Sequence, residues 1–483
     1  MMKKILTYLL ALLAVVLMGI ITVMLLPNMF RNISFLNLQP FGRPQSGEYR
    51  CVKTVKLGDV TPVTFAKMGC PSGYIETSPS GKFNLVGTES GKILLLKDNG
   101  EILWEKDSSI DKISFMHFMD DDNILLGIEG PGCNIRCVRF QDGSVVWDTK
   151  LNEGLNTEME NRIYPWIQYI SQDQQGNIYA IAQSYSFNSL HNREYDSVLY
   201  KLDPKGVICS RFPRTGTLDS CATSVKHIPG KQRVLFTSVN YYLRANNRYD
   251  KNLYCLDDGL QTELWSVSVP TIKPFRTAVI RSTPISEDGE GICFLSDGRY
   301  FAIRYDTGET EWQKRFMRAE TVMGVPLNST VVNTFYRSGK FYAVTSGSHN
   351  TKDSKLAVTV DVPAANSIFV FDRNGRVLRH IRADGLIGGR KSNLWKNSKG
   401  IALIPVGNNT TNRKRDMFGI KIIDLNAEED ITEARQLIHT EGICLSVTAD
   451  ELLEHIIVLT APYKDDDVNI YGNYELRIYK KSN

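Results

Sequence analysis

Past residue 50, short apolar runs alternate with polar turns along the rest of the chain. Within each run, apolar and polar side chains alternate with a period of two, and β-branched and aromatic residues are frequent, which predicts β-strands. The clearest hairpins carry an Asp/Asn-Gly type of turn and lie at 91–107, 135–151 and 300–316. Weaker copies lie at 197–212, 252–267, 367–381 and 419–437. The turn glycine supplies the positive φ that a tight hairpin requires.

A strand–turn–strand pair precedes each of these seven hairpins, and an eighth pair follows the last hairpin. The pairs lie at 78–89, 115–129, 169–183, 224–239, 282–297, 333–347, 393–407 and 446–462. Units of four strands that recur about every 45 residues are typical of a β-propeller and not of a helical solenoid. The sequence therefore predicts an all-β, eight-bladed β-propeller, with seven blades as the alternative.

The last unit lacks a fourth strand of its own. It starts near Ile443 and ends with the run 474–481, after which too little chain remains for an outer strand. The run CVKTVKL at 51–57 is the first β-like segment of the chain and can supply it. We therefore expect a propeller domain at 51–483 that is closed by its amino-terminal strand, which removes the open edges of the ring.

The amino-terminal segment predicts a membrane anchor. Residues 5–26 carry no charge, and a helix of this length spans about 33 Å, enough to cross a bilayer. A cleaved signal peptide is the alternative, but its apolar core is usually shorter and ends in an A-x-A-like site, which is missing here. Lys3 and Lys4 favour a cytoplasmic amino end. We expect an uncleaved signal-anchor at 1–27, a linker at 28–50 and a single-pass protein of the cell (inner) membrane with an extracytoplasmic propeller.

Composition narrows the possible partners. Lys+Arg (57) against Asp+Glu (53) gives a net charge of +4, far too little for a protein that coats nucleic acid, so no nucleic-acid partner is expected. Nine cysteines do not form a disulfide-dense scaffold. Cys209 and Cys221 flank a predicted connection between blades and are the best candidates for a disulfide.

Tryptophans recur at a fixed place in the hairpins. Trp104, Trp147 and Trp312 each follow a turn glycine by four residues, and Trp265 is displaced by two. Such a spacing predicts a structural role, in which each indole packs against a neighbouring blade. Arg379 and Ser210 occupy the corresponding positions of two other units.

These D-x-G-x-x-x-W turns resemble the repeats of the quinoprotein-dehydrogenase-like (PQQ-binding-like) β-propellers, over roughly residues 51–480. The resemblance implies a propeller fold and says little about chemistry. The family includes dehydrogenases and also non-enzymatic scaffolds, such as the lipoprotein subunit of the outer-membrane barrel-assembly machinery.

Motifs for catalysis are missing. The quinone enzymes of this family carry adjacent cysteines, which do not occur here, and Cys133 and Cys137 do not form a C-x-x-C-H haem site. The seven histidines are scattered, and the acidic runs 120–122 and 465–467 lack the register of a calcium loop. We expect no cofactor and no metal, and a non-enzymatic member of the family. The alternative is a divergent PQQ- or calcium-dependent dehydrogenase-like enzyme.

The predicted loops differ between the two sides of the ring. Turns on one side are uniformly short, whereas five loops between second and third strands are long, which indicates a binding surface. These loops and the neighbouring connections carry aromatic and basic residues, types that are typical of protein-binding hot spots. The candidate binding residues are Tyr241, Tyr242, Arg244, Arg248, Lys273, Arg276, Arg281, Arg318, Arg390, Lys391, Arg413, Lys414 and Arg415. The sequence predicts a membrane-tethered scaffold of an envelope assembly that binds a protein or polyanion on this side.

Overall fold

The computed structural model describes most of the chain after residue 47. The described ranges are 48–59, 63–64, 73–88, 90–107, 112–157, 164–187, 193–228, 230–239, 251–270, 279–282, 286, 290–318, 320–322, 325–327, 329–346, 362, 364–383, 394–406, 418–427, 431–462, 469–470 and 472–482. Residues 1–47 form a separate unit outside these ranges, so the predicted anchor and nearly all of the predicted linker lie there.

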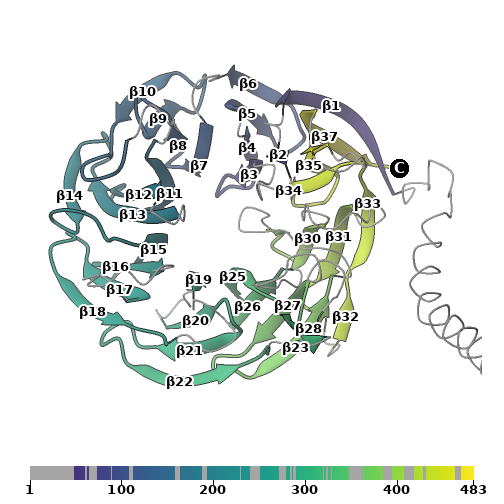
Figure 1. The fold of residues 1–483 in the computed structure, drawn as a ribbon. Helices are drawn as coiled ribbons and strands as arrows, with labels where there is room; N and C mark the ends of the chain where they lie inside the picture. The colour runs from purple at the N-terminus through teal and green to yellow at the C-terminus, as the bar shows by residue number, and fades with distance from the viewer. Residues whose placement is uncertain are drawn as a thin grey trace, which may run out of the picture. The chain divides into compact units, whose positions relative to one another are not determined.

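Eight sheets of four or five described strands surround a common axis, which confirms the eight-bladed β-propeller (Figure 1). Each blade runs outward from an inner strand to an outer strand. Blade 1 contains β3 (Gly73–Thr77), β4 (Phe83–Thr88), β5 (Lys92–Lys97) and β6 (Ile102–Asp107). Blade 2 contains β7 (Lys112–Phe118), β8 (Asn123–Glu129), β9 (Ile135–Arg139) and β10 (Val145–Thr149).

Blades 3 to 5 repeat this order. Blade 3 contains β11 (Trp166–Gln172), β12 (Ile178–Phe187), β13 (Arg193–Leu202) and β14 (Ile208–Phe212). Blade 4 contains β15 (Cys221–Ile228), β16 (Arg233–Val239), β17 (Leu253–Asp257) and β18 (Glu263–Val267). Blade 5 contains β19 (Ile280–Ser282), β20 (Gly291–Leu295), β21 (Arg299–Ile303) and β22 (Thr310–Arg315).

Blades 6 and 7 share a strand at the outer edge. Blade 6 contains β25 (Val331–Arg337), β26 (Lys340–Thr345), β27 (Ser367–Phe371) and β28 (Val377–Arg382). Blade 7 contains β29 (Trp395–Lys396), β30 (Ile401–Val406), β31 (Gly419–Asp424) and β33 (Arg435–His439). The segment between β31 and β33 forms β32 (Ile431–Glu433), which pairs in parallel with β28 and covers the edge of blade 6.

Blade 8 combines the two ends of the propeller. It contains β34 (Ile443–Ala449), β35 (His455–Ala461), β37 (Asn473–Lys481) and, as its outer strand, β1 (Tyr49–Asp59). β1 pairs antiparallel with β37, with Cys51 opposite Tyr479 and Val55 opposite Leu476. Hydrogen bonds between the first and last described strands therefore close the ring.

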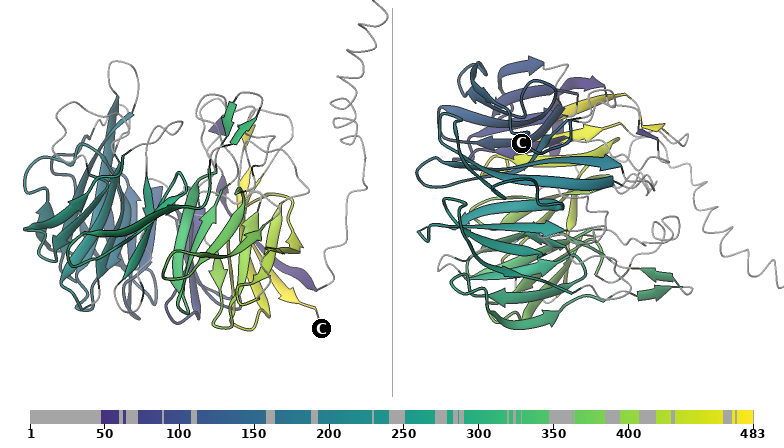
Figure 2. Two further views of the ribbon diagram at one scale, coloured as in Figure 1. Left: turned by 90° about the horizontal axis from the view of Figure 1, so that it is seen from below. Right: turned by 60° about the vertical axis from the view of Figure 1, so that its left-hand side comes forward.

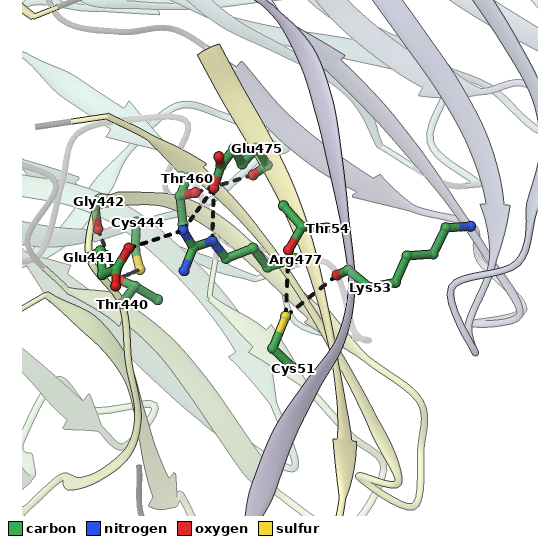
Figure 3. Close-up of polar contacts among 10 residues, drawn as sticks. All are labelled: Cys51, Lys53, Thr54, Thr440, Glu441, Gly442, Cys444, Thr460, Glu475 and Arg477. Carbon is green, nitrogen blue, oxygen red and sulfur yellow. Dashed lines mark hydrogen bonds and ion pairs between the residues drawn. The ribbon is translucent and has the colours of Figure 1, made fainter. Parts of the chain in front are cut away.

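Polar contacts support this closing sheet (Figure 3). On β37, Arg477 forms ion pairs with Glu475 at 2.8 Å and with Glu441 at 3.6 Å. On β1, the exposed thiol of Cys51 lies 3.6 Å from the hydroxyl of Thr54.

The contacts between blades repeat one arrangement. The indole Nε1 of Trp104 donates to the carbonyl of Phe140 in blade 2, at 2.7 Å. Trp147 donates to Pro204 in blade 3 at 3.2 Å, and Trp265 donates to Tyr305 in blade 5 at 2.9 Å. The acceptor is in each case a carbonyl of the turn that follows the third strand of the next blade. Trp312 lies over the corresponding turn of blade 6, where a Cβ added at Gly375 would come within 2.2 Å of its ring.

Where a tryptophan is missing, another donor makes the contact. Arg379 of blade 6 donates from Nη1 to the carbonyl of Leu425 in blade 7, at 2.9 Å. Ser210 of blade 3 is too short for this, and the hydroxyl of Tyr179 donates instead to the carbonyl of Asp258 in blade 4, at 3.0 Å. From blade 1 to blade 6, the contact therefore recurs at the same turn of the next blade although the side chain changes.

Two sides of the ring follow from the chain direction. Turns between first and second strands and between third and fourth strands lie on one side, here called the turn side. Connections between second and third strands, and those between blades, lie on the other side, here called the loop side. The short hairpin of β23 (Glu320–Val322) and β24 (Val325–Leu327) stands on the loop side, as does the pair of β2 (Val63–Thr64) with β36 (Asn469–Ile470) (Figure 2).

The structure bears on two sequence-based expectations, a membrane-spanning helix and a disulfide between Cys209 and Cys221. Within the described residues, no helix is long and apolar enough to cross a membrane. Cys209 is an exposed free thiol on the outer strand β14, whereas Cys221 is buried at the start of the inner strand β15, so the two are not joined in this structure.

Candidate functional site

Most of the predicted binding residues lie outside the described part of the chain. These are Tyr241, Tyr242, Arg244, Arg248, Lys273, Arg276, Arg390, Lys391, Arg413, Lys414 and Arg415. Of the remaining two, Arg281 belongs to β19, and Arg318 follows β22 on the loop side, where it is exposed. The predicted basic rim therefore stays a prediction.

The described residues contain an aromatic cluster on the loop side that the sequence reasoning missed. It consists of Trp166, Tyr185, Phe187 and Tyr195, here called the aromatic platform. The ring centroids of Trp166 and Tyr185 are 6.1 Å apart, and those of Trp166 and Tyr195 are 6.5 Å apart with the planes at 82°. Tyr185 meets Phe187 edge-on at 5.4 Å. These distances and angles are favourable for aromatic pairs.

Strand register explains why the four rings meet. β12 and β13 extend farther than most strands of the propeller, and Tyr185 lies directly opposite Tyr195 in their pairing. Trp166 lies opposite Gln183 across β11 and β12, and residues 183, 185 and 187 share one face of β12 because side chains alternate along a strand. The same face carries Ile181 and Tyr179, which pack toward blade 4. The platform is thus the loop-side end of the face that blade 3 turns to blade 4.

The platform remains partly accessible. Phe187 is 51% exposed, and the other three rings are half-buried. A large apolar side chain at this exposure loses contact with water only when another molecule covers it, which contributes about 25 cal/mol per Å² of apolar surface. Clusters of Trp and Tyr are typical of the centres of protein interfaces.

Buried hydrogen bonds hold the base of the platform in place. Gln183 donates to the hydroxyl of Ser197 at 2.9 Å, and Ser197 donates to the carbonyl of Ser220 in the connection to blade 4, at 2.7 Å. The hydroxyls of Ser220 and Ser238 are 2.5 Å apart. Since these groups are buried and each finds a partner, they fix blade 3 to blade 4 directly below the aromatic rings.

A second set of groups lies on the inner strands near the turn side. Burial raises the pKa of Glu76 on β3 to about 8. Burial lowers the pKa of His117 on β7, an effect opposed by a hydrogen bond with Gln172 of the next blade. Lys226 on β15 is exposed toward the axis, yet the surrounding protein desolvates it enough to lower its pKa. Such shifts mark candidate functional groups and also occur in structural positions.

No metal site accompanies these groups. Within the ranges given above, no three side chains of His, Cys, Asp or Glu are close enough to hold an ion together.

The sequence carries a signal for the platform, which is visible once the structure is known. The run AQSYSF at 182–187 continues the alternation of β12 beyond the length of the other second strands, with aromatic residues at two successive odd positions. Trp166 could not be connected with them from sequence because its place depends on the register between β11 and β12.

Comparisons with known proteins support the fold. No protein-family model matches the sequence, and no curated protein is similar enough to count as a relative. The C-terminal WD40 domain of Sif2 is similar in structure with a TM-score of 0.52 and 10% identity, over 89% of this chain and 99% of that domain. BamB from Moraxella catarrhalis has a TM-score of 0.42 and 10% identity, over 74% of this chain and 97% of that one. At such identities, the Sif2 likeness shows the propeller fold alone.

Proposed function

We propose that this protein is a membrane-tethered, extracytoplasmic β-propeller that binds another protein in an assembly of the cell envelope. The observation that carries the proposal is the aromatic platform, because it combines four clustered rings with partial exposure and a rigid hydrogen-bonded base. Such a surface suits a protein partner, since Trp, Tyr and Phe contribute large contact areas with little loss of conformational freedom.

The direction of the chain agrees with a partner on the loop side. β1 begins at Tyr49, which pairs with Lys481 at the turn-side end of β37. The propeller chain therefore begins at the turn side, whereas the aromatic platform lies on the loop side. The basic residues predicted for the rim would extend the same surface toward an acidic region of that partner.

Site-specific crosslinking tests the partner-binding surface. A photo-crosslinking amino acid replaces Phe187 on the platform or, as the control, Val207 next to β14, which is 60% exposed and lies on the turn side. We expect an adduct of one defined mass from position 187 in intact cells, and its loss when Trp166→Ala is added. Equal adducts from both positions, or an adduct at 187 that persists with Trp166→Ala, would contradict a platform-specific partner.

The tether is tested separately. Replacing Leu13 and Leu17 by Arg places two charges within the apolar segment, where each is costly. We expect the wild-type chain to stay in the membrane pellet at alkaline pH and the variant to be released. A membrane-impermeant maleimide should label the exposed Cys51 and Cys209 in intact cells. Labelling only after lysis would place the propeller in the cytoplasm.

A further inference from the structure

Two cations meet on the inner strands of blades 6 and 7, near the turn side. Lys396 ends β29, and Arg337 ends β25 of the preceding blade. The same contact between inner strands occurs elsewhere in the ring with neutral polar groups, as between Thr77 and Thr448, whose hydroxyls are 3.0 Å apart. Lys396 and Arg337 also lie at the ends of neighbouring inner strands, so the two contacts differ in residue type and not in strand arrangement.

The ammonium group of Lys396 lies over an aromatic ring. Its Nζ lies 3.7 Å from the ring centroid of Phe335, and Phe335 stacks on Tyr342 with centroids 4.5 Å apart and planes at 8°. The cation–π contact fixes the position of the charge without neutralising it. Lys396 is nevertheless exposed, so its ammonium group can be reached by a solute.

The guanidinium group of Arg337 belongs to the same strand as Phe335. Phe335 and Arg337 are two residues apart on β25, so both side chains point toward blade 7 and are separated by about 6–7 Å along the strand. Nη2 of Arg337 donates to the carbonyl of Ser398 at 2.6 Å. Nη1 is buried, and it has no hydrogen-bond partner among the described residues. Nη1 packs against Gly400, where an added Cβ would come within 2.5 Å of it, so the guanidinium group is held in a fixed place.

The charge balance around Lys396 and Arg337 is the third feature of this place. Within the described ranges, neither Lys396 nor Arg337 forms an ion pair with Asp or Glu. The carboxylate of Glu451 accepts hydrogen bonds from the backbone N–H and the hydroxyl of Ser398. Burial is the main reason that the pKa of Lys396 falls to about 8, and the charge of Arg337 lowers it further.

A second basic pair in the same ring shows the contrast. Lys231 and Arg233 of blade 4 also lie close together, but Asp306 of blade 5 stands between them, at 3.2 Å from Lys231 and 3.5 Å from Arg233. Among the described residues, one cation pair is therefore neutralised by a carboxylate of the next blade, and the other forms no ion pair with a carboxylate.

We propose that Lys396 and Arg337 form a binding site for a phosphoryl group. The guanidinium is a planar, permanently charged donor, and the exposed ammonium supplies a point charge, a combination suited to phosphate oxygens. Two cations match the charge of about −1.5 to −2 that a phosphate monoester carries at neutral pH, whereas a carboxylate would leave one charge unbalanced. This site is independent of the aromatic platform and lies on the opposite side of the ring.

Calorimetric titration with inorganic phosphate at about pH 7 and fixed ionic strength tests the site. We expect saturable binding to the full chain and a loss of affinity of about tenfold or more for Lys396→Met and for Arg337→Met. Lys396→Arg should retain most of the affinity, because it keeps the charge and the contact with Phe335. Lys231→Met is the matched control and should bind phosphate like the wild type, since Asp306 already occupies that pair.

A thermal melt without phosphate separates binding from folding. Lys396→Met should melt at nearly the wild-type temperature, because it removes one of two repelling charges, and phosphate should raise the melting temperature of the wild type alone. Binding to vesicles that contain phosphatidic acid is measured in addition. Binding that is lost in Lys396→Met indicates a lipid headgroup as the source of the phosphoryl group, and binding of inorganic phosphate alone indicates a free phosphate ester. Phosphate binding that is absent in the wild type, or unchanged in both Lys396→Met and Arg337→Met, overturns the proposal.

Discussion

The closure of the ring by β1 can be tested with a single buried side chain. Leu57 on β1 is fully buried and packs with Leu94 of blade 1 and Ile478 of blade 8. Val52 lies on the same strand and is 48% exposed. Truncation of either residue to Ala leaves the backbone pairing with β37 possible, so the two variants differ mainly in the apolar contacts that they remove.

The expected magnitudes are well separated. A buried Leu→Ala change removes transfer free energy and leaves a cavity, and costs about 2.7–5 kcal/mol in the best-studied series, which concerns T4 lysozyme. An exposed truncation away from special features costs about 0.5 kcal/mol or less. We therefore expect Leu57→Ala to lower the free energy of unfolding by at least about 2 kcal/mol more than Val52→Ala does.

Urea unfolding, followed by tryptophan fluorescence and circular dichroism in parallel, measures the difference. The midpoint and slope of each transition give the free energies if the two signals coincide. If Leu57→Ala and Val52→Ala shift the midpoint equally, β1 does not contribute its buried contacts to the stability of the ring, and the closure inferred from the pairing with β37 is wrong.

Three further outcomes follow from buried and exposed groups. Burial raises the pKa of Glu76 from 4.5 to about 8, so between these pH values the folded chain keeps a proton that the unfolded chain releases. The free energy of unfolding should therefore fall as the pH rises from 4.5 to 8. Urea titrations at several pH values should show this fall for the wild type and not for Glu76→Gln. Asp297→Ala leaves the buried Arg299 without its carboxylate and should cost about 3–5 kcal/mol in the same assay. Of the eight described cysteines, Cys51 and Cys209 should react first with a thiol reagent in the native protein, as judged by peptide mass mapping.

Each of these outcomes has a control. A stability of the wild type that rises between pH 5 and pH 8 relative to Glu76→Gln would reverse the sign expected for a buried acid. Arg304→Ala breaks the exposed pair with Glu311 and should leave the unfolding midpoint nearly unchanged, and an equally small effect of Asp297→Ala would count against the buried pair. Rapid native labelling of Cys255, whose thiol is buried with a pKa raised to about 12, would contradict its packing.

Local sequence patterns were sufficient for the architecture. A turn glycine, an alternating strand and a Trp at a fixed offset are short-range signals, and the repeated unit carries them often enough to give the number of blades. The same signals did not reveal that Arg379 and Tyr179 would replace a tryptophan at the blade contacts, since that depends on which carbonyl of the next blade lies within reach.

The candidate sites were harder to predict because they depend on contacts between distant strands. The platform requires the register of three strands, which places Trp166 beside residues that follow it by about twenty positions. The cation pair requires two inner strands of different blades to meet, and nothing near Lys396 in the sequence indicates Phe335 beneath it. The predicted basic residues of the long loops fall almost entirely outside the described ranges, so they stay a prediction.

The pairing of β1 with β37 also sets the order of events during synthesis. The strand that the ribosome releases first must wait for a partner that is made more than four hundred residues later. At about 5–20 residues per second, this delay is on the order of half a minute. Throughout that interval Leu57 has no blade 8 to pack on, and the nascent ring has an open seam. Cotranslational folding of this protein can therefore assemble blades, but the ring can close only after β37 has left the ribosome.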